Sequence, residues 1–198
     1  MFSAAEKNAK HNIEQISKAM FKGQKVLTTS TTCTFTMRDE YPDVLKVDNS
    51  MVRDSIVLAI RYIYEKLEKG ETKLVFKPGW HARAAYHVPC HMEKLGWSIF
   101  TRGLLGMIPG LELVNLDSNC CGISGTYGFK KENYKISQAI GDPLFKQIAQ
   151  VDPDYVACEC ETCKWQIEMS TSYKVMNPIS ILADALDLEA TEKANRMA

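Results

Sequence analysis

The sequence lacks an excess of charge of either sign. Its 198 residues include 24 Lys and Arg against 24 Asp and Glu, so the formal net charge at pH 7 is zero. Proteins that bind nucleic acid usually carry a basic surplus that neutralises phosphates, and this chain has none. We therefore expect no nucleic-acid partner.

The sequence also lacks a long apolar run. Its most apolar stretch, 97–114, is interrupted by Arg102, Pro109 and Glu112, and it falls short of the roughly 20 apolar residues that a membrane-spanning helix needs. The first residues are polar and do not resemble a secretory signal. Without an export signal, an odd number of cysteines, seven, indicates reduced thiols in the cytoplasm rather than disulfides.

What the chain does have is cysteine in a pattern. Five of the seven cysteines are Cys90, the adjacent pair Cys120 and Cys121, and the C-x-x-C pair Cys160 and Cys163. Clustered thiolates favour zinc, copper(I) or iron–sulfur clusters over hard cations. A tetrahedral zinc site uses four ligands and would leave one of the five without a role, so the count favours iron–sulfur. Buried free cysteines acting as small apolar residues would not explain the adjacent pair and the C-x-x-C together.

The apolar pattern predicts alternating helices and strands. Helices are expected near 3–22, 50–69, 93–107, 131–149 and 179–188, and strands near 25–29, 84–89, 112–117 and 154–158. Strands separated by helical segments indicate β-α-β units. We therefore expect an α/β fold, with a mostly parallel sheet flanked by helices. The cysteine cluster would lie at the strand carboxyl ends, where open α/β sheets bind their ligands.

An internal repeat relates two parts of the chain. With a shift of 130 positions, Ser30 and Cys33 lie over Cys160 and Cys163, and a valine precedes each pair by four positions. We expect the same strand–turn–helix path at both places. Ser30 cannot replace a thiolate in a stable cluster, so we assign no cluster to the first copy and interpret Cys33 as a leftover ligand. Cys158 is expected to be a buried thiol at a strand end.

Three motifs stand out around the cysteines: Tyr86-His87-x-Pro89-Cys90-His91, Cys120-Cys121-Gly122 and Cys160-x-x-Cys163. They resemble a known family, the CCG cysteine-rich domain of heterodisulfide reductase B subunits and related proteins. Longer runs are similar to the C-terminal part of the C subunits of anaerobic glycerol-3-phosphate dehydrogenases, at 32–42, 90–94, 120–134 and 160–170. The resemblance covers most of residues 20–187.

The resemblance implies an iron–sulfur electron-transfer subunit. Its cluster would be a [4Fe–4S] cubane with one sulfur left over, or a non-cubane cluster held by Cys90, Cys120, Cys121, Cys160 and Cys163. The implied partners are flavoprotein dehydrogenase subunits that oxidise sn-glycerol 3-phosphate, with onward transfer to membrane quinone. The protein would be cytoplasmic and peripheral on the inner face of the membrane.

The resemblance also implies a division of the chain. Family members begin with two ferredoxin-like cysteine motifs followed by two CCG modules, and those motifs are not in this sequence. We therefore expect the C-terminal half of a first, degenerate CCG module at 1–78 and a complete CCG domain at 79–198.

Other interpretations of the cysteines stay open. One is a zinc-bearing or metal-free structural domain that docks a partner, and another is thiol–disulfide chemistry at the C-x-x-C. His87 and His91 flank Cys90 and could ligate or tune a metal, although we interpret them as histidines with ordinary hydrogen-bond partners. The glycine-rich loop 122–128 is expected to bring backbone N–H groups close to cluster sulfides rather than to cradle a phosphate.

Overall fold

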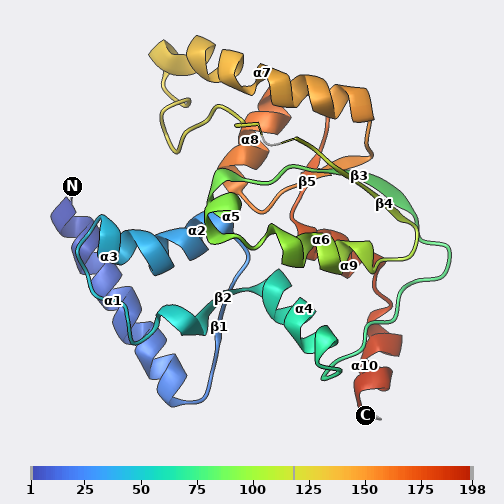
Figure 1. Ribbon diagram of the computed structural model, residues 1–198, viewed down its shortest axis with the longest axis horizontal. Helices are drawn as coiled ribbons and strands as arrows, with labels where there is room; N and C mark the ends of the chain where they lie inside the picture. The colour runs from blue at the N-terminus through green and yellow to red at the C-terminus, as the bar shows by residue number, and fades with distance from the viewer. Residues whose placement is uncertain (1, 118, 197–198) are drawn as a thin grey trace.

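The computed structural model describes residues 2–117 and 119–196 (Figure 1). The strands are β1 (Val26–Thr28), β2 (Ile56–Leu58), β3 (Ala82–Tyr86), β4 (Leu111–Asn115), β5 (Tyr155–Ala157) and β6 (Val175–Met176). The α-helices are α1 (Phe2–Phe21), α2 (Thr31–Phe35), α3 (Tyr41–Asp43), α4 (Ala59–Glu68), α5 (Cys90–Leu95), α6 (Ser98–Gly106), α7 (Tyr134–Val151), α8 (Glu161–Ser170), α9 (Pro178–Ala185) and α10 (Leu188–Arg196). A π-helical turn, η1, spans Thr36–Glu40, and the 3₁₀ turns are η2 (Arg53–Ser55) and η3 (Lys131–Asn133).

The strands pair in parallel in both sheets that the described residues form. β4, β3, β5 and β6 make a four-stranded sheet in that order, with Ala85 of β3 opposite Val114 on one side and Val156 on the other. β1 and β2 make a separate two-stranded sheet. The predicted α/β fold, a mostly parallel sheet flanked by helices, is confirmed.

Helices cover both faces of the four-stranded sheet (Figure 1). Ala85 of β3 packs in a cluster with Leu144 of α7, whereas the next residue, Tyr86, packs with Leu104 of α6 and Ile181 of α9. Successive side chains of a strand point to opposite faces, so a strand covered on both sides is buried at consecutive positions. β3 is therefore part of the middle layer of three.

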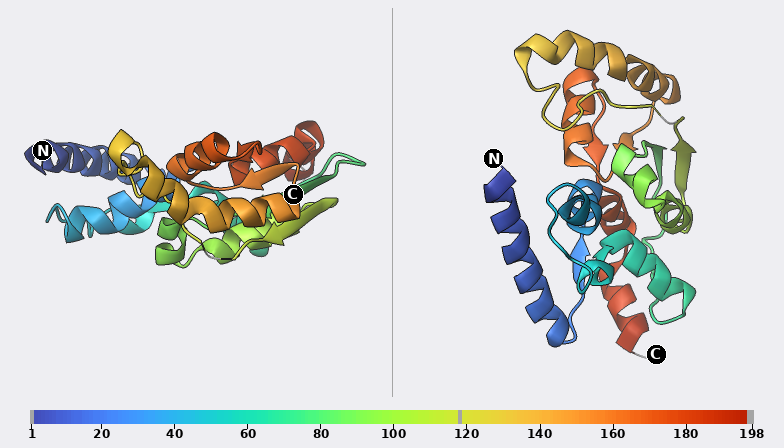
Figure 2. Two further views of the ribbon diagram at one scale, coloured as in Figure 1. Left: turned by 90° about the horizontal axis from the view of Figure 1, so that it is seen from above. Right: turned by 60° about the vertical axis from the view of Figure 1, so that its left-hand side comes forward.

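The N-terminal part of the chain, which precedes β3, packs on the side of the four-stranded sheet that α6 and α9 cover. Leu58 of β2 belongs to the same buried cluster as Tyr86 of β3. The guanidinium carbons of Arg38 and Arg61 lie 5.0 and 4.3 Å from the ring centre of Trp97, at cation–π distance. α1 lies at one edge of the molecule, away from the four-stranded sheet (Figures 1 and 2).

The helix predicted over 50–69 is only partly correct. Arg53–Ser55 is a 3₁₀ turn, Ile56–Leu58 is strand β2, and the helix begins at Ala59. β2 pairs with β1, with Val57 opposite Leu27. A three-residue apolar strand that runs directly into a helix matches helical spacing as well as strand spacing, so periodicity alone does not separate them.

The helix predicted over 93–107 is two helices. α5 begins at Cys90 and ends at Leu95, because Gly96 adopts the left-handed conformation of a C-cap, with φ of 68°. α6 then begins at Ser98. The apolar pattern predicts neither β6, which has only two residues, nor α10, which has no buried residue.

The predicted repeat of backbone path is confirmed. β1 leads through Ser30, with φ of −116° and ψ of 130°, into α2. β5 leads through Cys160, with φ of −119° and ψ of 116°, into α8. Each residue occupies the N-cap position of its helix, so Ser30 stands where the second copy has a thiol.

The longest described helix, α1, has 20 residues but carries lysines and glutamates along its length. No helix among residues 2–117 and 119–196 combines the length and hydropathy needed to cross a membrane.

Candidate metal centre

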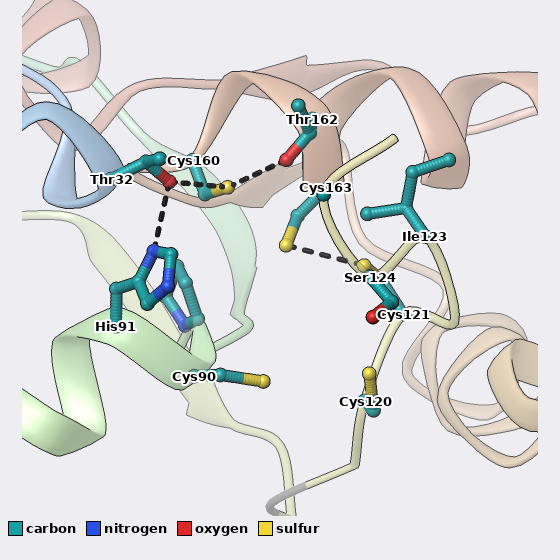
Figure 3. Close-up of a pocket in the computed structure, with 12 residues that line it drawn as sticks. Thr32, Cys90, His91, Cys120, Cys121, Ile123, Ser124, Cys160, Thr162 and Cys163 are labelled. Carbon is teal, nitrogen blue, oxygen red and sulfur yellow. Dashed lines mark hydrogen bonds between the residues drawn. The ribbon is translucent and has the colours of Figure 1, made fainter. Parts of the chain in front are cut away.

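The structure brings all five patterned cysteines to one cavity of about 260 Å³ (Figure 3). Cys90 is the first residue of α5 and follows β3, and Cys120 and Cys121 lie in the loop after β4. Cys160 occupies the N-cap position of α8 after β5, and Cys163 lies in the first turn of that helix. The carboxyl ends of parallel strands meet at the same edge of a sheet, which is why segments far apart in sequence converge here.

The sulfurs are reduced and unequally exposed. The Sγ atoms of Cys121 and Cys163 lie 3.2 Å apart, well beyond the S–S bond of about 2.05 Å, and all seven cysteines are free. Cys121, Cys160 and Cys163 are buried, whereas Cys90 and Cys120 are exposed. The cavity therefore has a closed side and an open side.

Cys160 is an acidic thiol. A hydrogen bond from Cys163 lowers the pKa of Cys160 to about 4, with further help from the hydroxyls of Thr162 and Thr32 and against burial, which raises it. The Oγ1 atoms of Thr162 and Thr32 lie 3.2 and 3.4 Å from the Cys160 sulfur. The pKa of Cys163 is raised: the hydrogen bond that it accepts from Cys121 lowers it, but its hydrogen bonds with Cys158 and Cys160 and its burial outweigh that effect.

A second acidic thiol lies on the open side. Hydrogen bonds from Cys121 and then Cys90 lower the pKa of Cys120 to about 2, and the N–H of Gly122 donates to its sulfur at 3.3 Å. The same hydrogen bonds raise the pKa of Cys90 and of Cys121, because the donor must keep its proton. A metal that binds several of these sulfurs must displace the remaining thiol protons, so its affinity rises with pH.

His87 lies beside Cys121 and Cys163, outside the cavity lining, without the hydrogen-bond partner that we expected. Its side chain is buried, and its Nε2 atom has no partner within the described part of the chain. A ring nitrogen of His87 and the sulfurs of Cys121 and Cys163 lie within 4.8 Å of one another. Burial lowers the pKa of His87 to about 4, which keeps the imidazole neutral and able to bind a metal. Its place in the motif at 86–91, three residues before Cys90 and at a strand end, is the sequence signal for this role.

Thr32 and His91 also line the cavity, and no motif in the sequence assigned Thr32 a role in this site. The Thr32 hydroxyl lies within hydrogen-bond distance of the Cys160 sulfur and, at 3.1 Å, of His91 Nδ1. The ring of His91 stacks on Phe35, with centroids 4.9 Å apart. Thr32 of α2, from the first copy of the repeat, thus contributes to the lining of the site of the second copy.

The two remaining cysteines lie outside the cavity lining. Cys33 is exposed. Cys158 is buried at the end of β5, as predicted, and burial raises its pKa. Between Cys158 and Cys160, the buried Glu159 accepts hydrogen bonds from Tyr86 and Thr101, at 3.0 and 2.6 Å.

The donor set fits an iron–sulfur cluster. Five soft sulfur donors surround one cavity, and the buried Nε2 atom of His87 has no partner among the residues that the structure describes. In the loop 122–128, the backbone N–H of Gly122 donates to the Cys120 sulfur, so one loop N–H group faces a candidate ligand. Gly122 adopts φ of 88°, and a Cβ there would lie 2.0 Å from the Ser137 carbonyl oxygen, so only glycine fits this turn.

Residues 84–168, which contain all five cysteines, match the family model of the CCG cysteine-rich domain and belong to that family. Over 183 residues the chain is 58% identical to the C subunit of the anaerobic glycerol-3-phosphate dehydrogenase of Escherichia coli K12, a match covering 92% of this chain and 46% of that protein.

More distant relatives share the same region. The chain is 32% identical to lactate utilization protein A of Geobacillus thermodenitrificans, over 78% of this chain and 66% of that protein. It is 27% identical to the B subunit of the fumarate reductase (CoM/CoB) of Methanothermobacter marburgensis. That match covers 86% of this chain and 34% of that protein. The chain thus spans less than half the length of the relative that is 58% identical to it.

Proposed function

We propose that this chain is an iron–sulfur electron-transfer module whose ligands are Cys90, Cys120, Cys121, Cys160 and Cys163. The observation that supports this most is the convergence of all five thiols on one cavity. The sequence similarity to an uncharacterized iron–sulfur protein of Methanocaldococcus jannaschii, 29% identical over 57% of this chain, agrees with it.

The cluster that we propose is of the [4Fe–4S] type. A cubane needs four thiolates and would leave one of the five sulfurs unused, whereas a non-cubane cluster would use all five. When bound, such a cluster accepts and donates single electrons.

The chain's own residues would hold the cluster and set its surroundings. Cys121, Cys160 and Cys163 are buried and would keep water from one side, whereas Cys90 and Cys120 leave the other side open. The hydrogen bonds from Gly122 and Thr162 to ligand sulfurs would offset negative charge and favour the reduced state.

The proposed partners follow from the relative that is 58% identical. That protein is named as one subunit of anaerobic glycerol-3-phosphate dehydrogenase, so we propose that this chain receives electrons from flavoprotein subunits oxidising sn-glycerol 3-phosphate. It would pass them towards membrane quinone, on the inner face of the membrane. The division into a degenerate module at 1–78 and a CCG domain at 79–198 belongs to the same proposal, and the matching path at Ser30 and Cys160 supports it.

A zinc site is the second candidate. His87, Cys121 and Cys163 offer three buried donors within 4.8 Å of one another, and one more sulfur would complete a tetrahedral structural site. In that case the domain would serve as a docking or structural unit.

Anaerobic reconstitution separates the two candidates. The protein is supplied with iron and sulfide, and separately with zinc, and then desalted. Iron, sulfide and zinc are measured together with the visible spectrum. We expect about four irons per chain, as the proposed cluster type requires, and a broad brown absorbance. A colourless product that retains zinc but no iron would contradict the iron–sulfur proposal and support the structural one.

A further inference from the structure

The threonine that reaches the cysteine site comes from the other copy of the repeat. Thr32 lies in α2, and its Oγ1 atom is 3.4 Å from the Cys160 sulfur and 3.1 Å from His91 Nδ1 (Figure 3). One hydroxyl therefore connects the ligand-bearing end of α8 to α5.

Contacts of residues before and after Thr32 in the sequence fix its position. The backbone N–H of Thr31 donates to the carbonyl of Glu159 at 3.0 Å, next to Cys160. Phe35, on the same helix as Thr32, stacks on His91 at an interplanar angle of 9°. Contacts before and after Thr32 thus hold its hydroxyl against Cys160, and the contact does not depend on a free rotamer of an exposed side chain.

The direction of the two hydrogen bonds follows from their chemistry. A cysteine sulfur bound to a metal carries no proton and can only accept, so Thr32 must donate to it. The hydroxyl has one proton, so its oxygen must accept from His91, whose Nδ1 then carries a proton. We propose that Thr32 is a positioning residue of the metal centre: it donates to the Cys160 sulfur, and His91 donates to Thr32.

This inference rests on the proposed cluster, and it assigns a role to the copy that has lost a thiolate. A hydrogen bond to a ligand sulfur offsets part of the negative charge of the cluster, and the reduced state gains most from that. α2 therefore contributes to the reduction potential of a centre for which it provides no ligand.

The test compares four variants of the full chain. Thr32→Val keeps the shape and removes the hydroxyl, whereas Thr32→Ser keeps the hydroxyl. His91→Phe keeps an aromatic ring against Phe35 and removes the donor. Thr34→Val is the matched control on the same helix, because the Thr34 hydroxyl donates to the Ser30 carbonyl at 2.7 Å rather than to a cysteine. The reduction potential is measured after anaerobic reconstitution, together with the iron–thiolate stretching bands in resonance Raman spectra.

We expect Thr32→Val to bind as much iron as the unmodified chain, to have a more negative potential and to show shifted iron–thiolate bands. His91→Phe should shift the potential in the same direction by less, and the double variant by no more than Thr32→Val alone. Thr32→Ser and Thr34→Val should match the unmodified chain. An unchanged potential in Thr32→Val, or an equal shift in Thr34→Val, would overturn the proposal. If Thr32→Val does not fold, an unchanged potential in His91→Phe overturns it equally.

A measurement on the metal-free protein keeps this inference separate from the proposed function. Imidazole ¹⁵N spectra, assigned with His91→Phe, report which nitrogen of His91 carries the proton. In the unmodified chain we expect the proton on Nδ1 of His91. In Thr32→Val the ¹⁵N resonances of His91 should move away from the positions that indicate this protonated Nδ1. A proton on Nε2 alone contradicts the hydrogen-bond chain. If the unmodified chain takes up no cluster, the proposed function fails, and these spectra alone decide on the contact between Thr32 and His91.

Discussion

Cys121 and Cys33 are chemically identical side chains in opposite surroundings. Cys121 is buried beside Cys163, whereas Cys33 is exposed and lies outside the cavity. We expect Cys121→Ser to abolish the visible absorbance of the reconstituted protein, because oxygen is a hard and poor substitute for a thiolate on iron. Cys33→Ser should leave the absorbance unchanged. Visible spectra and iron analysis of the two variants check this.

The melting temperature of the same variants separates a cluster from a structural zinc site. If the centre is a redox cluster on a fold with its own core, Cys121→Ser should lose colour while the far-ultraviolet circular dichroism and the melting temperature largely persist. A structural zinc site predicts the reverse, since metal binding would then supply folding free energy. If the unmodified protein has no visible absorbance after reconstitution and Cys121→Ser sharply lowers its melting temperature, the cluster proposal is contradicted.

The turn that carries the cysteine pair depends on one of its glycines more than on another. Gly122 and Gly125 both have positive φ, but a Cβ on Gly122 would lie 2.0 Å from the Ser137 carbonyl oxygen, whereas one on Gly125 would meet nothing within 4 Å. We expect Gly125→Ala to cost about 1 kcal/mol of unfolding free energy, for the left-handed backbone alone. Gly122→Ala should cost about 3 kcal/mol or more, because the steric clash adds to it.

Urea unfolding of both variants measures the difference, and the iron content after reconstitution shows whether the turn still presents Cys120 and Cys121. Equal losses of unfolding free energy in Gly122→Ala and Gly125→Ala would mean that the close approach of Gly122 to Ser137 of α7 does not constrain this turn.

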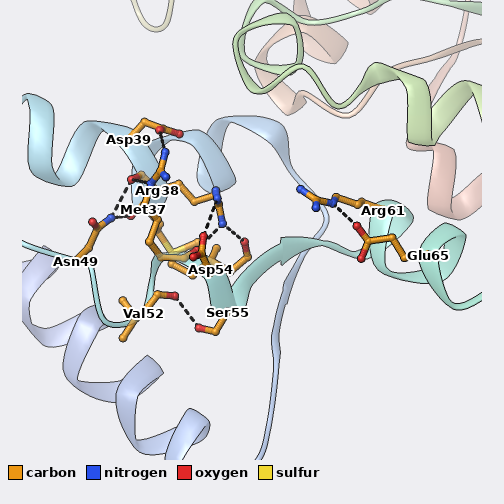
Figure 4. Close-up of polar contacts among 11 residues, drawn as sticks. Met37, Arg38, Asp39, Asn49, Val52, Asp54, Ser55, Arg61 and Glu65 are labelled. Carbon is orange, nitrogen blue, oxygen red and sulfur yellow. Dashed lines mark hydrogen bonds and ion pairs between the residues drawn. The ribbon is translucent and has the colours of Figure 1, made fainter.

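The π-helical turn η1 depends on Asn49 (Figure 4). The buried amide of Asn49 donates to the carbonyls of Met37 and Arg38, at 2.6 and 2.9 Å. Asn49→Ala would leave both carbonyls without this donor, and we expect it to cost about 2–3 kcal/mol. Asp54 is the control: its carboxylate is 93% exposed and lies 3.4 Å from Arg38, so Asp54→Ala should cost less than about 1 kcal/mol. Thermal unfolding of both variants checks the ranking, and a larger loss in Asp54→Ala would contradict it.

The two parts of the molecule share one core. Leu58 and Ile60, from the N-terminal part, belong to the same buried cluster as Tyr86, Leu104 and Ile181. We therefore expect a single unfolding transition, with circular dichroism and tryptophan fluorescence changing together. Leu58→Ala should lower the free energy of unfolding by about 2–5 kcal/mol and still give a single transition. Two separate transitions would show that the parts fold independently.

At the scale of the whole molecule, the sequence predicted what depends on local chemistry. Cysteine spacing and alternating apolar segments were sufficient for the parallel sheet and for five cysteines near its carboxyl edge. The sequence did not reveal β2, because its partner β1 is distant in sequence and its spacing also fits a helix. It did not reveal the contact of Thr32 with Cys160 either, because that contact depends on how two distant copies of the repeat pack. That the Nε2 atom of His87 has no hydrogen-bond partner among residues 2–117 and 119–196 depends on burial, which one sequence does not show.

The five cysteines of the cavity come from three separate segments, after β3, β4 and β5, and this has a consequence for the order of events during biosynthesis. Before those strands pair, Cys90, the pair Cys120 and Cys121, and the C-x-x-C are three unconnected groups of thiols on a flexible polymer. Contacts between distant segments form late, since loop closure must precede them. All three groups can therefore bind one metal or cluster together only after the sheet has assembled. In the folded chain the cavity is open to solvent on the side of Cys90 and Cys120, which are exposed.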